Sequence, residues 1–321
     1  MCRLNKRYGL NSSVETRPQN IVGGVCLIVA AALTISVQDV VFKLFSSELT
    51  LWQIFTLRGL LAVPVLLIVA IARKEHKSIV RAALGKWPML RAIFITMTFL
   101  AFYSAIPFLS LSTVGAANYI APVFVTLLSA YVIRERVGKF GWFAVFIGFA
   151  GVIVLLQPGS DAFSLWTLLP VLGAAFYALA HITTRTKCQG VPAGAFALSQ
   201  NLIMLFAGLI VSSVLVLLKP QGETANAYPY LFGMWSKVSL NDWLVLALLA
   251  VFAIAISMLL AGAYQAAPPA IVSTFEYSYL VFVALWDILF FDNSPTAVTI
   301  TGMALIVTAG LLTLRRTGYS A

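Results

Sequence analysis

Charged side chains are scarce in this sequence. They make up 10% of its 321 residues, whereas a soluble domain has about 25%. The deficit extends along nearly the whole chain, 61% of which is hydrophobic, with a mean hydropathy of +0.96. This composition excludes a soluble globular domain and predicts a membrane protein that crosses the bilayer several times.

Cysteine and histidine are also rare. The three cysteines (Cys2, Cys26, Cys188) lie far apart and the two histidines (His76, His181) do not complement them, so we expect no metal site. No phosphate-binding loop, HExxH or GxSxG motif is present, and no cofactor is predicted. A membrane enzyme would need a nucleophile, base or metal set, which these scattered residues do not form.

Long apolar runs fill the rest of the chain. A helix of about 20 apolar residues spans a bilayer core of about 30 Å. The first run extends to Phe45 after a basic tail, which is too long for a removed signal peptide. Ten membrane helices are therefore expected, at 21–45, 51–72, 88–108, 112–133, 140–157, 164–184, 194–218, 242–264, 269–290 and 296–314.

Lysine and arginine predict the orientation of these helices. With the N-terminus inside, the inner segments carry 16 of the 21 basic residues, and the outer segments carry only Lys219 and Lys237. Cytoplasmic loops are enriched in Lys and Arg, so both termini are predicted to be cytoplasmic. The net charge of +10 thus reflects topology and contact with anionic lipid, and nucleic acid is not needed to explain it.

An internal repeat relates the two halves. Residues 112–133 read STVGAANYIAPVFVTLLSAYVI and residues 270–291 read AIVSTFEYSYLVFVALWDILFF, with Tyr119 matching Tyr277 and Val-Phe-Val matching at 123–125 and 281–283. The offset equals five helices, so the second half crosses in the opposite sense. Inverted repeats are typical of secondary transporters, whose substrate site lies near the midplane between the halves.

The expected organisation is an all-α membrane protein of two inverted five-helix repeats around a central cavity. The predicted parts are a basic cytoplasmic tail (1–20), a first repeat (21–157), a second repeat (158–314) containing an outer loop (219–241), and a cytoplasmic tail (315–321).

One segment resembles a known family. Residues 121–156, APVFVTLLSAYVIRERVGKFGWFAVFIGFAGVIVLL, resemble the signature of the drug/metabolite transporter superfamily in its EamA-type ten-helix branch, with Glu135-Arg136 at the characteristic turn. TLRGLLAVPVLL at 56–67 resembles the second helix of that branch. Within it the chain looks most like bacterial amino-acid exporters of the YddG type. The resemblance implies that helices 1–4 and 6–9 surround the cavity, and it implies a bacterial inner membrane.

Four charged residues fall in the outer half of the expected spans. They are Asp39, Lys43, Arg58 and Asp287, and their formal charges cancel. Charges inside a membrane are expensive and need a partner. Two interpretations remain open, a structural ion-pair network and an extracellular gate that breaks during transport.

Glu276 lies near the midplane of the ninth expected helix, with no basic residue at the same depth. Asn118 occupies the matching place in the first repeat. Glu276 has two candidate functions, proton coupling and binding of a substrate amino group, beside the alternative of a protonated core residue. The paired polar positions favour a binding site.

Other polar and aromatic residues inside the spans complete the expected substrate site. His181 has the alternative of a core or interfacial residue, and most buried aromatics serve packing. Pro122 is a predicted hinge, because proline removes a helix hydrogen bond. The further candidates are Gln38, Phe99, Tyr103, Tyr119, Tyr177, His181, Asn201, Tyr264 and Tyr277.

The sequence thus predicts a secondary transporter of small metabolites that works by alternating access. Export of amino acids, aromatic or otherwise neutral, is the leading expectation. The alternative is a proton-coupled transporter of another metabolite, such as a vitamin, a nucleoside or a drug. A channel is disfavoured, because no ring of like charges and no filter-like loop is present.

Overall fold

The structure is a computed structural model of the chain. It describes residues 20–44, 49–105, 120–135, 137–156, 166, 168–218, 228–291 and 297–317. Within these ranges the regular structure is helical and contains no strand, so the all-α fold class is confirmed.

In the first half, helices coincide with the expected apolar windows. The elements are α1 (Ile21–Leu44), α2 (Leu51–Ala72), α3 (His76–Ala83), α4 (Lys86–Ala105), α6 (Ala121–Leu128), the π-helical turn η1 (Ser129–Ile133) and α7 (Lys139–Leu156). The short helix α3 was not expected and lies in the basic segment between α2 and α4.

The second half continues in the same way. Its elements are α8 (Leu168–Lys187), α9 (Ala193–Leu218), α11 (Pro229–Phe232), α12 (Leu240–Ala266), α13 (Pro269–Glu276), α14 (Ser278–Phe291) and α15 (Ala297–Thr317). The single turn α11 lies in the expected outer loop 219–241. Ser239 starts α12 with a capping box, in which its side chain accepts from Asp242 N and the Asp242 carboxylate accepts from Ser239 N.

Six of the described helices are long and apolar enough to cross a membrane. They are Ile21–Val41, Leu51–Ala72, Lys86–Ala105, Ala193–Leu218, Leu240–Ala266 and Pro269–Phe290. Ala121–Ile133, Lys139–Val154 and Ile300–Ala309 are shorter apolar helices. Helix α8 carries Arg185 and Lys187 in its last turn and packs between α4, α6 and α12. The chain is a multi-pass membrane protein, and the number of ten crossings remains a prediction.

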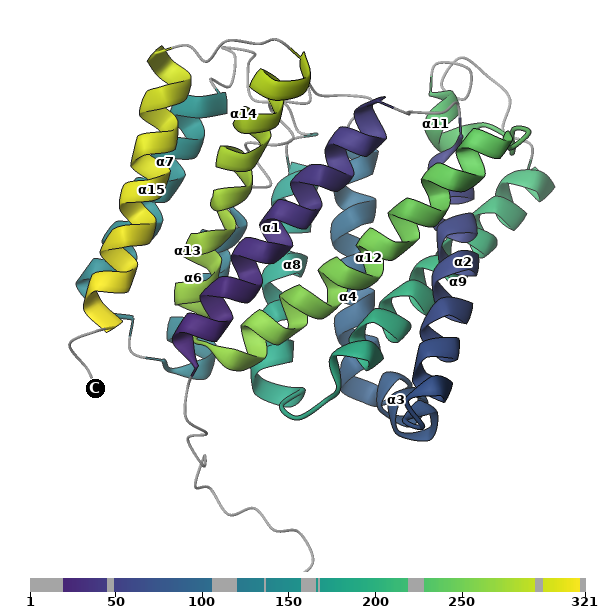
Figure 1. The fold of residues 1–321 in the computed structure, drawn as a ribbon, viewed down its shortest axis with the longest axis horizontal. Coiled ribbons are helices and arrows are strands. Elements are labelled where there is room, and N and C mark those ends of the chain that lie inside the picture. The colour runs from purple at the N-terminus through teal and green to yellow at the C-terminus, as the bar shows by residue number, and fades with distance from the viewer. Residues whose placement is uncertain are drawn as a thin grey trace, which may run out of the picture.

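The two ends of the bundle are distinct. Figure 1 shows that α1 begins and α15 ends at the same end of the molecule, where α3 also lies. We call this the termini end and the opposite one the far end. Helix α11 lies at the far end (Figure 1), as expected for an outer loop.

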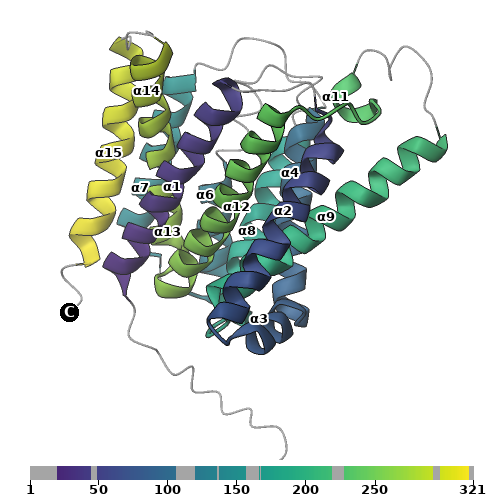
Figure 2. The same ribbon diagram turned by 45° about the vertical axis from the view of Figure 1, so that its right-hand side comes forward.

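Helices that are distant in the sequence form the main packed pairs. The most extensive contacts join α7 to α15, α4 to α8, α2 to α9 and α1 to α12. In both views α7 and α15 stand at one edge, while α9 runs obliquely away at the other (Figure 2). Each pair joins one helix of the first half to one of the second.

Two glycines let α2 and α9 approach closely. A Cβ on Gly208 would lie 2.5 Å from Thr56 Oγ1 and 2.8 Å from the carbonyl oxygen of Trp52. A Cβ on Gly59 would lie 2.8 Å from that of Leu205. Close backbone approach through small residues is a common way to pack helices in membranes.

Two expected helices are interrupted. The fourth is α-helical to Leu128, then π-helical to Ile133, and ends at Arg134 in a left-handed conformation (φ 61°). The ninth is divided at Tyr277 into α13 and α14. Pro122 stands in the first turn of the described α6, where proline has no hydrogen bond to remove. Residues 106–119 lie outside the described part of the chain, and the role of Pro122 as a hinge remains a prediction.

Candidate functional site

A carboxyl group and two tyrosines meet in the interior of the bundle. Glu276 is the last residue of α13, and its Oε1 accepts hydrogen bonds from Tyr177 Oη on α8 (2.9 Å) and Tyr264 Oη on α12 (2.6 Å). Both donors are neutral hydroxyls, and no ion pair to Glu276 occurs in the described part of the chain. Three helices, α8, α12 and α13, therefore converge on one acidic group.

His181 extends this cluster toward the termini end. Its ring lies 4.0 Å from the Tyr264 ring and 4.2 Å from the Tyr177 ring, centroid to centroid. The side chain is fully buried, and neither ring nitrogen has a hydrogen-bond partner among the described residues. We call Tyr177, His181, Tyr264 and Glu276 the Glu276 cluster.

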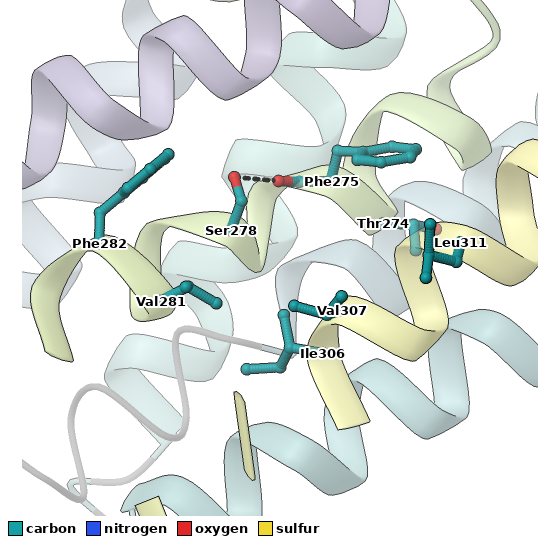
Figure 3. A pocket seen from close by; sticks show the side chains of 8 residues that line it. All are labelled: Thr274, Phe275, Ser278, Val281, Phe282, Ile306, Val307 and Leu311. Atoms are coloured by element: carbon teal, nitrogen blue, oxygen red, sulfur yellow. Dashed lines mark hydrogen bonds between the residues drawn. The ribbon is translucent and has the colours of Figure 1, made fainter. Parts of the chain in front are cut away.

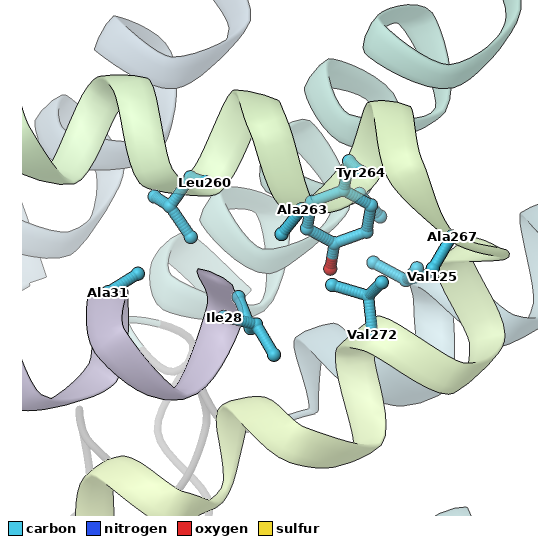
Figure 4. Packing of buried hydrophobic residues seen from close by; sticks show 9 residues of the cluster. Ile28, Ala31, Val125, Leu260, Ala263, Tyr264, Ala267 and Val272 are labelled. Carbon is cyan, nitrogen blue, oxygen red and sulfur yellow. The ribbon is translucent and has the colours of Figure 1, made fainter. Parts of the chain in front are cut away.

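Apolar packing holds Tyr264 in place. Its ring is 0% exposed and packs among Ile28, Val125, Val272 and their neighbours from α1, α6 and α13 (Figure 4). A tyrosine in such a site directs its hydroxyl to the nearest acceptor. The hydrogen bond from Tyr264 to Glu276 is therefore positioned by helices of both halves.

Arg91 lies on α4 near the cluster and is the one functional candidate that sequence reasoning missed. It is 0% exposed, with Nε donating to Thr184 Oγ1 (3.2 Å) and Nη1 to Gln200 Oε1 (3.1 Å). The available signal was its place inside an apolar run, because only Lys43, Arg58 and Arg91 among the basic residues lie within expected spans. Because Arg91 lies close to the start of the expected span 88–108, it looked like a residue of the membrane surface.

The aromatic candidates of the third helix belong to a different cluster. Phe99 and Tyr103 stack with centroids 6.1 Å apart, and Tyr103 also contacts Phe55 and Tyr230 at 6.2 and 6.4 Å. This group lies toward the far end, where α2 begins and α11 lies. It is not joined to the Glu276 cluster by any described hydrogen bond or ring contact.

Tyr277 packs against other helices, and Asn201 is hydrogen-bonded within its own helix. The Tyr277 side chain is 0% exposed and packs against Val152 and Ile306 of α7 and α15, with its ring directly under Gly148. Asn201 donates to the carbonyl oxygen of Ala197 in its own helix (2.8 Å). Asn118 and Tyr119 lie outside the described residues, and Gln38 lies on α1, which contacts α13 and α14.

The four charged residues of the outer half are only partly described. The side chains of Lys43 and Asp287 lie outside what the structure describes. Asp39 accepts a hydrogen bond from Tyr279 Oη. Arg58 donates from Nη2 to Met204 Sδ (3.1 Å), and its guanidinium lies 5.9 Å from the Phe55 ring centroid. Asp39 and Arg58 are not paired with each other, and the expected four-member network remains a prediction.

A second polar cluster closes the termini end. Glu135 accepts from Ser129 Oγ (2.7 Å) and forms an ion pair with Arg185 Nε (3.4 Å). Arg185 Nη1 also donates to the carbonyl oxygen of Gln265 (3.1 Å), whose own amide donates to the carbonyl oxygen of Cys188. This Glu135–Arg185 cluster joins the ends of η1, α8 and α12. The sequence marked Glu135 only by its resemblance to a family turn.

The described pocket is apolar and lies at the side of the bundle. It lies between α13–α14 and α15 (Figure 3). Its volume is about 220 Å³. Its two polar residues are Thr274 and Ser278, and the Ser278 hydroxyl donates to the carbonyl oxygen of Phe275 (2.7 Å). Such a lining offers little to a polar metabolite. Among the described residues, no group of three His, Cys, Asp or Glu side chains could hold a metal.

Comparison with known proteins agrees with a membrane transporter. Residues 22–157 match the model of the EamA-like transporter family. The pseudopaline exporter CntI of Pseudomonas aeruginosa is 27% identical over 89% of this chain and 94% of its own length. The S-adenosylmethionine uptake transporter of Rickettsia prowazekii is 20% identical over 94% of both chains.

Two further likenesses extend this result. A riboflavin transporter of Vibrio cholerae is 28% identical over 58% of this chain and 57% of its own length. A protein of known crystal structure shares the fold, with a TM-score of 0.74 and 16% identity over 94% of this chain and 99% of that one. With the helical fold, these likenesses support a membrane transporter of small metabolites and not an enzyme. The expected amino-acid export is not among the functions for which these relatives are named.

Proposed function

We propose that this chain is a secondary transporter that exports amino acids, aromatic or otherwise neutral, by alternating access between two inverted halves. The observation that carries the proposal is the Glu276 cluster. A carboxyl group inside an apolar bundle is costly unless it is paired, yet among the described residues Glu276 is held only by the hydroxyls of Tyr177 and Tyr264. A substrate ammonium group would supply the missing cation.

The pairing of helices supports the inverted repeat. In the order of the ten expected spans, α8, α9, α12 and α15 stand five places after α1, α2, α4 and α7. If each helix is exchanged with its counterpart, the α1–α12 contact becomes the α8–α4 contact, and α2–α12 becomes α9–α4. The pairs α2–α9 and α7–α15 map onto themselves. A two-fold axis in the membrane plane produces this pattern. Under the same proposal both termini face the cytoplasm of a bacterial inner membrane.

A second candidate is proton-coupled transport of another metabolite on the same scaffold. The names of the relatives favour it, because one is a riboflavin transporter and another an S-adenosylmethionine uptake transporter. Glu276 then exchanges a proton instead of an ammonium group.

An uptake screen separates the two candidates. Purified protein in liposomes is offered the 20 common amino acids, riboflavin and S-adenosylmethionine, each radiolabelled. Amino-acid export predicts saturable uptake of one or more amino acids, which Glu276→Gln slows while Glu75→Gln, at an exposed carboxylate, does not. Uptake of only riboflavin or S-adenosylmethionine would support the second candidate and contradict the first.

A further inference from the structure

Arg91 is a fully buried cation whose partners are all neutral. Its contacts in the described structure are the Thr184 hydroxyl, the Gln200 amide oxygen and the face of the Phe196 ring, 5.1 Å from the guanidinium carbon. The remaining nitrogen, Nη2, is buried and has no hydrogen-bond partner there. One donor nitrogen of the planar guanidinium therefore makes no hydrogen bond to the described residues.

No described acidic group balances this charge. The ion pair found in the described residues joins Arg185 to Glu135 and does not involve Arg91. A guanidinium stays charged in proteins, and an uncompensated buried charge destabilises the fold. The neutral partners also have other bonds, because Thr184 donates to the carbonyl oxygen of Ala180 and Gln200 Oε1 accepts from Ser257. Packing alone would be served equally well by an uncharged side chain.

The place of Arg91 connects it to the Glu276 cluster. Its partner Thr184 lies on α8 three residues after His181 and seven after Tyr177. Residues at this spacing share one face of a helix, and seven residues span about 10 Å along the axis. One face of α8 thus contacts a carboxyl group at one level and a guanidinium about two turns nearer the termini end.

We propose that Arg91 binds a carboxylate of the transported molecule, at a position distinct from the group that Glu276 binds. The inference rests on the proposed transport of a small metabolite and narrows its substrate class to molecules with an acidic group. Arginine presents two parallel N–H groups to a carboxylate, and Nη2 with Nη1 supplies such a pair once Gln200 turns aside. Because Arg91 is 0% exposed, α4, α8 and α9 must separate at this level for the substrate to enter.

The test uses pairs of probes that differ only in the carboxylate. N-acetyl-L-phenylalanine and N-acetyl-L-leucine are compared with their amides, in detergent at constant chloride, by the ligand-dependent rise in unfolding temperature. We expect the acids to stabilise the wild-type protein more than the amides. Arg91→Gln should lose this preference, with an apparent affinity for the acids about 10- to 100-fold lower, as for loss of a charged hydrogen bond.

Two further variants keep the test decisive. Arg81→Gln removes an exposed arginine of α3 and should keep the full preference for the acids. Arg91→Lys keeps the charge but not the fork, so it should fold even if Arg91→Gln does not, with a weakened preference. Equal stabilisation by acids and amides, no stabilisation by either, or an unchanged preference in the folded Arg91 variants would overturn the proposal.

The outcomes also distinguish this proposal from the proposed function. If the acids bind through Arg91 but no amino acid is taken up into liposomes, amino-acid transport is wrong and the carboxylate site stands. If an amino acid is taken up with an unchanged KM in Arg91→Gln and Arg91→Lys, transport stands and the carboxylate site is wrong.

Discussion

At the scale of single residues, Glu276 differs from the other acidic groups of the bundle in its surroundings. The groups that face it are the hydroxyls of Tyr177 on α8 and Tyr264 on α12, and the His181 ring stacks on Tyr264 and is tilted against Tyr177. Asp39 at the far end has a tyrosine partner, and Glu135 at the termini end has an arginine. Glu276 is therefore the carboxyl group best placed to exchange a proton for a substrate cation.

Replacement of Glu276 by Gln should remove the pH dependence of transport. If the carboxyl group takes up a proton when the substrate leaves, uptake by the wild-type protein depends on pH. An amide cannot titrate, so the rate of the variant should not change with pH. Initial uptake rates into liposomes measure this, with Glu75→Gln as the control. A variant with the wild-type pH profile would exclude Glu276 from proton coupling.

The sequence was informative about these residues to a limited extent. Depth along an apolar span identified Glu276, and Tyr177, His181 and Tyr264 were candidates for the substrate site, because polar groups in hydrocarbon need a reason. It could not tell which side chains meet, since Tyr277 follows Glu276 directly yet points toward α7 and α15. Arg91 was missed because its burial depends on α8 and α9, which are distant in the sequence.

At the scale of elements, the closed termini end depends on where η1, α8 and α12 meet. The Glu135–Arg185 cluster and the bonds of Gln265 to the carbonyl oxygens of Cys188 and Val191 hold these ends together. The π-helical turn before Glu135 contributes, because Ser129 at its start donates to that carboxylate. If the molecule opens at this end, this cluster is the set of contacts that must break.

Cys188 should report such opening. Its side chain is 0% exposed, and burial raises the pKa of the thiol to about 11. The thiolate is the reactive form, so labelling by a maleimide should be slow near neutral pH and rise about tenfold for each pH unit below 11.

The same reagent can test the closing contact. In a background with Cys2 and Cys26 replaced by Ser, Glu135→Gln should speed labelling of Cys188 by at most about fivefold, the effect of one partly exposed ion pair. Glu75→Gln is the control and should leave the rate unchanged. A rate that does not respond to Glu135→Gln would show that this ion pair does not keep the termini end closed.

The α2–α9 pair makes a separate prediction about stability. Gly208→Ala would place a methyl group 2.8 Å from the Trp52 carbonyl oxygen, so the helices must move apart, at a cost of about 1–3 kcal/mol in the free energy of unfolding. Gly194→Ala, on the same helix, meets only Ile79 Cδ1 at 3.5 Å and is the matched control. Thermal unfolding in detergent measures both, and equal stability of the two variants would contradict the close approach.

Elements were more predictable than sites, for a physical reason. Helix windows follow from the length of apolar runs, and α2 has the expected bounds of 51–72 because Thr50 caps it and polar residues follow it. The amphipathic helix α3 is short and charged, so a search for apolar runs passes over it. The interruptions at η1 and Tyr277 arise from packing and carry no proline or glycine signal.

At the scale of the whole molecule, the two halves pack crosswise, and the proposed transport needs one polar interior that both halves share. Each major helix pair joins the halves, so the halves can rock only by changing those contacts together. The expectation of an inverted repeat came from residues 112–133 and 270–291, and the exchange of helix pairs is consistent with it. Under the proposed alternating access, Glu276 and Arg91 are reached from one side of the membrane at a time.

Counterflow in liposomes tests this central claim most directly. Purified protein is reconstituted into liposomes loaded with an excess of an unlabelled amino acid that it takes up, and a trace of the labelled form is added outside. A carrier with one alternately exposed site should accumulate the label transiently above its outside concentration, and only when the inside is loaded. Label that only equilibrates, whether or not the inside is loaded, would indicate a channel and contradict the account.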